Sequence, residues 1–125
     1  MATRSYIGIM DKDGVGAHVI YCHWDGYPEW VGMVLKKFYD TEEKARALLE
    51  LGDLSSLGET LETTESYARD RGEEPSPARY CANKEQLFGA ARGCWAEYVY
   101  LFNPELARWE CMATIRDEGF REIAL

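Results

Sequence analysis

The segment Tyr21-Cys22-His23-Trp24-Asp25-Gly26-Tyr27-Pro28 constrains the fold most strongly, because one hydrophobic periodicity stops there and another begins. Before it, residues 17–24 show the two-residue alternation of a β-strand. After it, the apolar side chains of residues 30–38 recur every three or four positions, as on one face of a helix. Pro28 suits the first turn of that helix, where its missing N–H would have no partner in any case. The sequence therefore predicts a strand that turns directly into a helix.

Other strands and helices are predicted by similar patterns. Strand-like runs, joined in pairs by Asp/Gly-rich or Asn-Pro turns, predict two β-hairpins. The predicted strands cover residues 5–10 and 17–24, then 95–102 and 108–116, with residues 120–125 as a short further strand or a packed tail. The predicted helices run from Pro28 to about Tyr39 with Trp30 on the apolar face, from an Asp40/Glu43 capping pair to Gly52, and from an Asn83 cap to about Gly93.

This order predicts a single α+β domain over residues 1–125. We expect an antiparallel sheet of about four strands, formed by the two hairpins, with helices packed on one face. No alternating βαβ series is present, which argues against a doubly wound nucleotide-binding fold. Residues 59–80 are polar and charged, and we expect a mobile surface insertion there with weak helical turns at most, around residues 61–68.

Charge is concentrated in one part of the chain. Residues 40–75 contain eleven acidic and four basic side chains, so this segment carries −7 of the net charge of −8. Direct binding of nucleic acid requires the opposite sign. A protein partner with a basic surface fits this charge better. The alternative is that the charge only keeps the protein in solution.

The pair Cys22-His23 raises the possibility of metal or nucleophilic chemistry. Adjacent residues of a strand point to opposite faces of the sheet, so these two side chains should not share a metal ion or a proton. The four cysteines form no C-x-x-C pair, and reduced, buried thiols are the better interpretation. Asp11-Lys12-Asp13-Gly14 superficially resembles a calcium loop but lacks the later ligands. We therefore expect no catalytic residue, no metal site and no cofactor.

Trp24, Asp25 and Tyr27 admit two interpretations. In the first, both aromatic rings fill the interface between sheet and helix while Asp25 caps the helix. In the second, they form a rigid recognition edge, since Trp and Tyr are favoured at binding hot spots.

The sequence also resembles a family of small phage- and prophage-encoded proteins. The resemblance is carried by residues 3–9 (TRSYIGI), 20–28 (IYCHWDGYP), 31–32 (VG), 51–58 (LGDLSSLG) and 97–102 (EYVYLF), with Trp109. It covers most of the chain outside residues 59–80. It implies no activity, cofactor or catalytic residue, but it does imply a phage setting, in which small acidic proteins often block host machinery such as CRISPR or restriction systems.

We therefore expect a phage-encoded protein of the host cytosol that inhibits a bacterial defence system stoichiometrically, as anti-CRISPR proteins do. Its partner would be a host protein with a basic surface; we expect no direct contact with nucleic acid or membrane. The expected partner-binding residues are Trp24, Asp25, Tyr27, Glu59, Glu62, Glu65, Glu73 and Glu74. A structural or regulatory phage protein remains an alternative, and so does a small Cys/His enzyme built on Cys22, His23 and Asp25.

Overall fold

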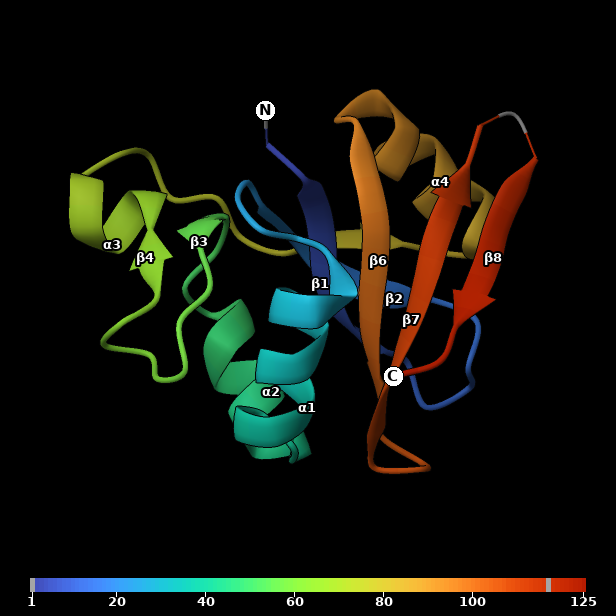
Figure 1. Cartoon of the computed structure of the whole chain (residues 1–125), viewed down its shortest axis with the longest axis horizontal. Coiled ribbons are helices and arrows are strands. Elements are labelled where there is room, and N and C mark those ends of the chain that lie inside the picture. The colour runs from blue at the N-terminus through green and yellow to red at the C-terminus, as the bar shows by residue number, and fades with distance from the viewer. Residues whose placement is uncertain (1, 117) are drawn as a thin grey trace.

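The computed structural model describes residues 2–116 and 118–125, which form one mixed sheet with helices around it (Figure 1). The strands are β1 (Arg4–Met10), β2 (Ala17–Cys22), β3 (Leu54–Ser56), β4 (Glu65–Ser66), β5 (Arg79–Cys81), β6 (Ala96–Asn103), β7 (Arg108–Ile115) and β8 (Gly119–Ile123). The helices are η1 (Pro28–Gly32, a π-helix), α1 (Met33–Phe38), α2 (Glu42–Leu49), α3 (Tyr67–Arg71) and α4 (Lys84–Gly93).

The sheet is larger than predicted and is not purely antiparallel. Its eight strands follow the order β4-β3-β2-β1-β6-β7-β8, with β5 paired to β2 beside β3. Both predicted hairpins are present, as β1–β2 and β6–β7. The prediction of about four antiparallel strands is wrong because β1 pairs with β6 in parallel, which joins the hairpins into one sheet, and because β3, β4, β5 and β8 extend it.

Helices cover both faces of the sheet, which corrects the prediction that they pack on one face. Ile7, on one face of β1, belongs to a core with residues of η1, α1 and α2. Tyr6, on the other face, belongs to a second core with Leu87 and Ala91 of α4. The central strands are apolar on both faces, so each face requires its own cover.

The helix ends follow local capping chemistry. The predicted Asn83 cap of α4 is confirmed, since its side chain accepts a hydrogen bond from the Gln86 amide. The predicted Asp40/Glu43 pair is wrong: the Thr41 hydroxyl accepts from the Lys44 amide instead. Asp40 forms an i,i+4 ion pair with Lys44 at 3.3 Å. Thr41 has the extended backbone that an N-cap requires, and α2 begins at the next residue.

Residues 59–80 contain more regular structure than predicted. They include β4, α3 and the start of β5, and Thr64 and Ser66 are buried. The Ser66 hydroxyl donates to the Leu51 carbonyl at 2.9 Å, and Arg79 forms an ion pair with Asp53 at 2.8 Å. These polar contacts hold the segment against the sheet. Because polar contacts produce no hydrophobic periodicity, the sequence pattern did not indicate this structure. Whether the segment moves in solution stays a prediction to be tested.

The tight packing of β1 against β2 gives a test of this register. A Cβ added at Gly8 would lie 2.3 Å from the His18 carbonyl oxygen, whereas one added at Gly89 in α4 would meet nothing within 4 Å. We expect Gly8→Ala to lower the free energy of unfolding by about 1–3 kcal/mol, as overpacking does. Gly89→Ala should raise it by about 0.5–1 kcal/mol. Urea unfolding of both variants measures this, and a neutral Gly8→Ala would contradict the register.

Candidate functional site

The turn from strand to helix is held by three backbone hydrogen bonds to two neighbouring segments. Beyond the end of β2, the amides of His23 and Trp24 donate to the carbonyls of Leu54 and Ser55 at 3.0 and 2.9 Å. The Gly26 amide donates to the Thr3 carbonyl at 2.8 Å. A Cβ at Gly26 would lie 2.7 Å from that same carbonyl, so the close approach requires glycine. The chain therefore has little freedom to rearrange here.

Two further features fix the sharp reversal. Asp25 has a φ of 57°, a left-handed conformation that Asp tolerates better than most residues. The buried Tyr100 hydroxyl donates to the Gly26 carbonyl at 2.6 Å. Tyr100 lies on β6, 74 positions further along the chain, so the central strand supports the turn directly.

The helix that follows begins with one π-helical turn rather than an α-helical one. Pro28 occupies its first turn, as predicted. The Tyr27 carbonyl accepts from the amides of both Trp30 and Val31 at 3.1 Å. π-Helical turns are rare and are frequently found at functional sites. In η1 the turn keeps Val31 and Gly32 buried while Trp30 lies at the surface.

Three aromatic side chains of this turn, Trp24, Tyr27 and Trp30, lie at the surface of the protein, and we call them the aromatic edge. Their exposed fractions are 44%, 38% and 36%. The Trp30 indole donates to the Leu57 carbonyl at 2.9 Å, and the Trp24 amide donates to Ser55 two residues earlier. Two tryptophans are thus anchored on the same short stretch of backbone, with their rings available to solvent.

This exposure argues against the first interpretation of the segment, in which both rings fill the interface between sheet and helix. Trp24 and Tyr27 do not fill the interface between sheet and helix, and Trp30 is only partly buried, although the helical pattern placed it on the apolar face. Asp25 does not cap the helix either, because its carboxylate accepts from the Tyr27 hydroxyl at 3.3 Å. The helical pattern placed Trp30 with the core residues and therefore did not single it out as an exposed side chain.

Cys22, His23 and Asp25 do not form a shared site. Cys22 is fully buried in the core beneath α1 and α2, its thiol directed to the Trp24 carbonyl at 3.7 Å. Burial raises the pKa of this thiol to about 12. His23 Nδ1 lies 2.7 Å from the Tyr21 hydroxyl, and Tyr21 packs against the core on the opposite face. A nucleophile–base pair therefore does not exist between Cys22 and His23.

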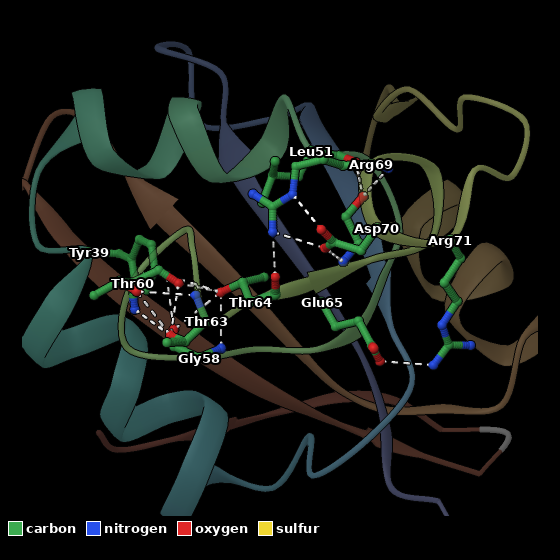
Figure 2. A network of polar contacts seen from close by, with 11 residues as sticks. Tyr39, Leu51, Gly58, Thr60, Thr63, Thr64, Glu65, Arg69, Asp70 and Arg71 are labelled. Carbon is green, nitrogen blue, oxygen red and sulfur yellow. Dashed lines mark hydrogen bonds and ion pairs between the residues drawn. The ribbon is translucent and has the colours of Figure 1, made fainter.

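The predicted acidic residues are distributed over three places. Glu59 and Glu62 lie in the turn before β4, and Glu73 and Glu74 follow α3; all four are exposed and form no ion pair with any residue that the structure describes. Glu65 differs, because its carboxylate binds Arg71 at 2.8 Å (Figure 2). Glu59 and Glu62 closely follow the segment 55–57, whose carbonyls anchor Trp24 and Trp30.

The turn that carries Glu59 and Glu62 is itself well ordered by polar contacts. The buried Tyr39 hydroxyl donates to the Gly58 carbonyl at 2.9 Å, and the Gly58 amide donates to Thr64 Oγ1 at 3.0 Å. Figure 2 shows Thr60, Thr63 and Thr64 gathered around these groups. The threonine spacing in the sequence gives no sign of this network, because hydrogen bonds of this kind have no periodicity.

Two negative observations apply to the described part of the chain. Among residues 2–116 and 118–125, no group of three or more His, Cys, Asp or Glu side chains is arranged to hold a metal ion. Within the same residues, no helix has the length and apolar character needed to cross a membrane.

The support from Tyr100 can be tested with a matched pair. We expect Tyr100→Phe to lower the free energy of unfolding by about 1–3 kcal/mol, because it leaves the buried Gly26 carbonyl without a donor. Tyr98→Phe, on the same strand, removes a hydroxyl without a hydrogen-bond partner among the described residues and should change it by less than about 0.5 kcal/mol. Urea unfolding distinguishes the two, and equal effects would contradict the assigned role.

The cysteines give a second test. We expect iodoacetamide at pH 8 to modify the half-buried Cys94 in the folded protein and to spare Cys22. The Cys22 thiol is buried, and its raised pKa keeps it protonated at pH 8. Mass spectrometry after digestion measures this. Rapid modification of Cys22 before unfolding would show that it is an accessible nucleophile and would restore the enzyme alternative.

Comparisons with known proteins identify no relative. No protein-family model, no curated protein and no solved structure matches this chain. The resemblance to phage-encoded proteins therefore stays a prediction, and the functional argument depends on the geometry of the site.

Proposed function

We propose that this protein works by binding another protein through the aromatic edge of Trp24, Tyr27 and Trp30, as a stoichiometric inhibitor of a bacterial defence system of the anti-CRISPR type. The observation that carries the binding role is the exposure of three large aromatic side chains on a backbone that is hydrogen-bonded to β3, to Thr3 and to Tyr100. The phage setting comes from the sequence resemblance alone.

A fixed aromatic edge is well suited to tight binding. Trp and Tyr are enriched among hot-spot residues, each worth about 2 kcal/mol or more when truncated. Little conformational entropy is lost on binding when the backbone and the indole are already held, as the Trp30 indole is by Leu57. This pre-organisation supports a recognition role over a purely structural one.

The exposed carboxylates favour a partner with a basic surface. Glu59, Glu62, Glu73 and Glu74 are not neutralised by ion pairs within the described residues, and Asp25 and Glu29 add negative charge beside the aromatic edge. Charges of this kind steer a basic partner and raise its association rate, an effect that falls with ionic strength. Covering a basic, nucleic-acid-binding groove is one way in which such a protein could inhibit a CRISPR effector.

Catalysis has less support. Cys22 is buried, His23 is bound to Tyr21 and Asp25 to Tyr27, so the three do not face a common substrate position. A structural or regulatory phage protein remains the second candidate, since an exposed aromatic edge could equally bind a virion component.

A phage-plating assay on hosts with and without CRISPR immunity tests the proposal. Expression of the protein should raise plating efficiency only on the immune host, and the double variant Trp24→Ala/Trp30→Ala should lose this effect. Leu106→Ala, which truncates an exposed apolar side chain in the turn between β6 and β7, is the control and should retain it. No protection by the wild-type protein against any CRISPR or restriction system tested would reject the inhibitor role.

The acidic contribution is tested separately. We expect the quadruple variant with Gln at positions 59, 62, 73 and 74 to bind its partner with an association rate reduced about tenfold or more at low salt, and less at 0.5 M salt. Glu65 is left intact because it neutralises Arg71. Unchanged association kinetics at both salt concentrations would reject electrostatic steering and leave the aromatic edge as the whole interface.

A further inference from the structure

A group of hydrogen-bond donors lies beside Trp24, in contrast to the acidic surface elsewhere. The antiparallel register pairs Ser5 with Cys22, so Arg4 lies one position beyond that pair, level with His23, which follows the end of β2. From the other side of β2, Arg71 of α3 donates to the Ser55 hydroxyl at 3.1 Å, and the Ser55 carbonyl accepts from the Trp24 amide. Arg4 on β1 and Arg71, which contacts β3, therefore flank the His23–Trp24 pair along the sheet, one on each side of β2.

The His23 ring contacts both Trp24 and Tyr21. Its ring meets Trp24 edge to face, with ring centroids 4.7 Å apart, and its Nδ1 lies 2.7 Å from the Tyr21 hydroxyl. Burial raises the pKa of Tyr21, so the phenol keeps its proton at neutral pH. Burial, with Arg4 and Arg71, lowers the pKa of His23 below its usual value, so the imidazole is neutral there. In the tautomer in which Tyr21 donates to Nδ1, the imidazole proton is on Nε2 and can be donated to an anion.

The two arginines differ in how far they are already neutralised. Arg71 binds Glu65 at 2.8 Å and stacks over the Tyr67 ring. Arg4 donates only to the Cys94 carbonyl, at 3.4 Å, and forms no ion pair within the described residues. A half-buried guanidinium without a carboxylate partner, in a protein of net charge −8, is available to an external anion.

We propose that Arg4, His23 and Arg71 form a binding site for an oxyanion, a phosphate or a carboxylate, and that the exposed Trp24 ring contacts the group that carries it. Guanidinium groups recognise such anions through paired N–H donors, and an adjacent indole adds stacking on a planar ring. The acidic field of the protein favours a small ligand over a nucleic-acid polymer, which it repels at longer range. This site does not depend on the proposed function and can exist with or without a protein partner.

The two histidines make the site directly observable, because the chain contains only His18 and His23. Imidazole proton signals in NMR spectra are followed during titration with inorganic phosphate and, separately, with phenyl phosphate, at pH 7 and constant ionic strength. The His23 signals should shift to saturation while those of His18 stay in place. If Trp24 contacts the carrier, phenyl phosphate should bind roughly fivefold more tightly or better. Equal affinities would identify the free oxyanion as the ligand.

Variants separate this site from general attraction of anions. Arg4→Gln should remove the saturable shift, and Arg71→Gln should weaken it at least severalfold. Arg46→Gln, which removes an exposed arginine from an i,i+4 pair on α2, should leave it unchanged. Trp24→Ala should abolish only the advantage of phenyl phosphate. The proposal is overturned if the His23 signals do not saturate, if His18 shifts equally, or if the shift persists when Arg4 and Arg71 are both replaced in a protein whose amide spectrum remains dispersed.

Discussion

The parallel pairing of β1 with β6 is the constraint on which the rest of the structure depends. It joins two hairpins that are far apart in the sequence, and it places both strands in the middle of the sheet, where both faces must be covered. It also positions Tyr100 beneath the turn between β2 and η1, where its hydroxyl holds the Gly26 carbonyl. The turn that carries the aromatic edge is thus supported by a strand in the middle of the sheet.

The turn between β2 and η1 exposes large aromatic side chains. Large rings at a surface carry a cost in solubility, which is usually accepted where they bind something. The same turn separates two kinds of charge: carboxylates continue from the segment that anchors Trp30, while Arg4 and Arg71 lie on either side of His23. A partner that used the whole surface would therefore have to be basic in one part and anionic in another.

The sequence predicts those elements whose periodicity is strong. The alternation in residues 5–10 and 17–24 and the aromatic run before Asn103 correspond to β1, β2 and β6, and the Asn83 cap is correct. The short strands β3, β4 and β5 could not be predicted, because two or three residues such as Glu65 and Ser66 show no period. Nor could the β1–β6 pairing, since two strands without a connecting βαβ pattern give no indication of their mutual direction.

At the candidate site, the sequence singled out Trp24, Asp25 and Tyr27. It did not single out Trp30, Arg4 or Arg71, because their relevance depends on contacts made across strands.

Amide hydrogen exchange at Gly26 and Trp24 tests the central claim, that the aromatic edge is pre-organised, most directly. Both amides donate to backbone carbonyls and should exchange as slowly as those in the middle of β1, while the Lys12 amide in the hairpin turn should exchange fast. Exchange of Gly26 and Trp24 at the rate of Lys12 would contradict this account.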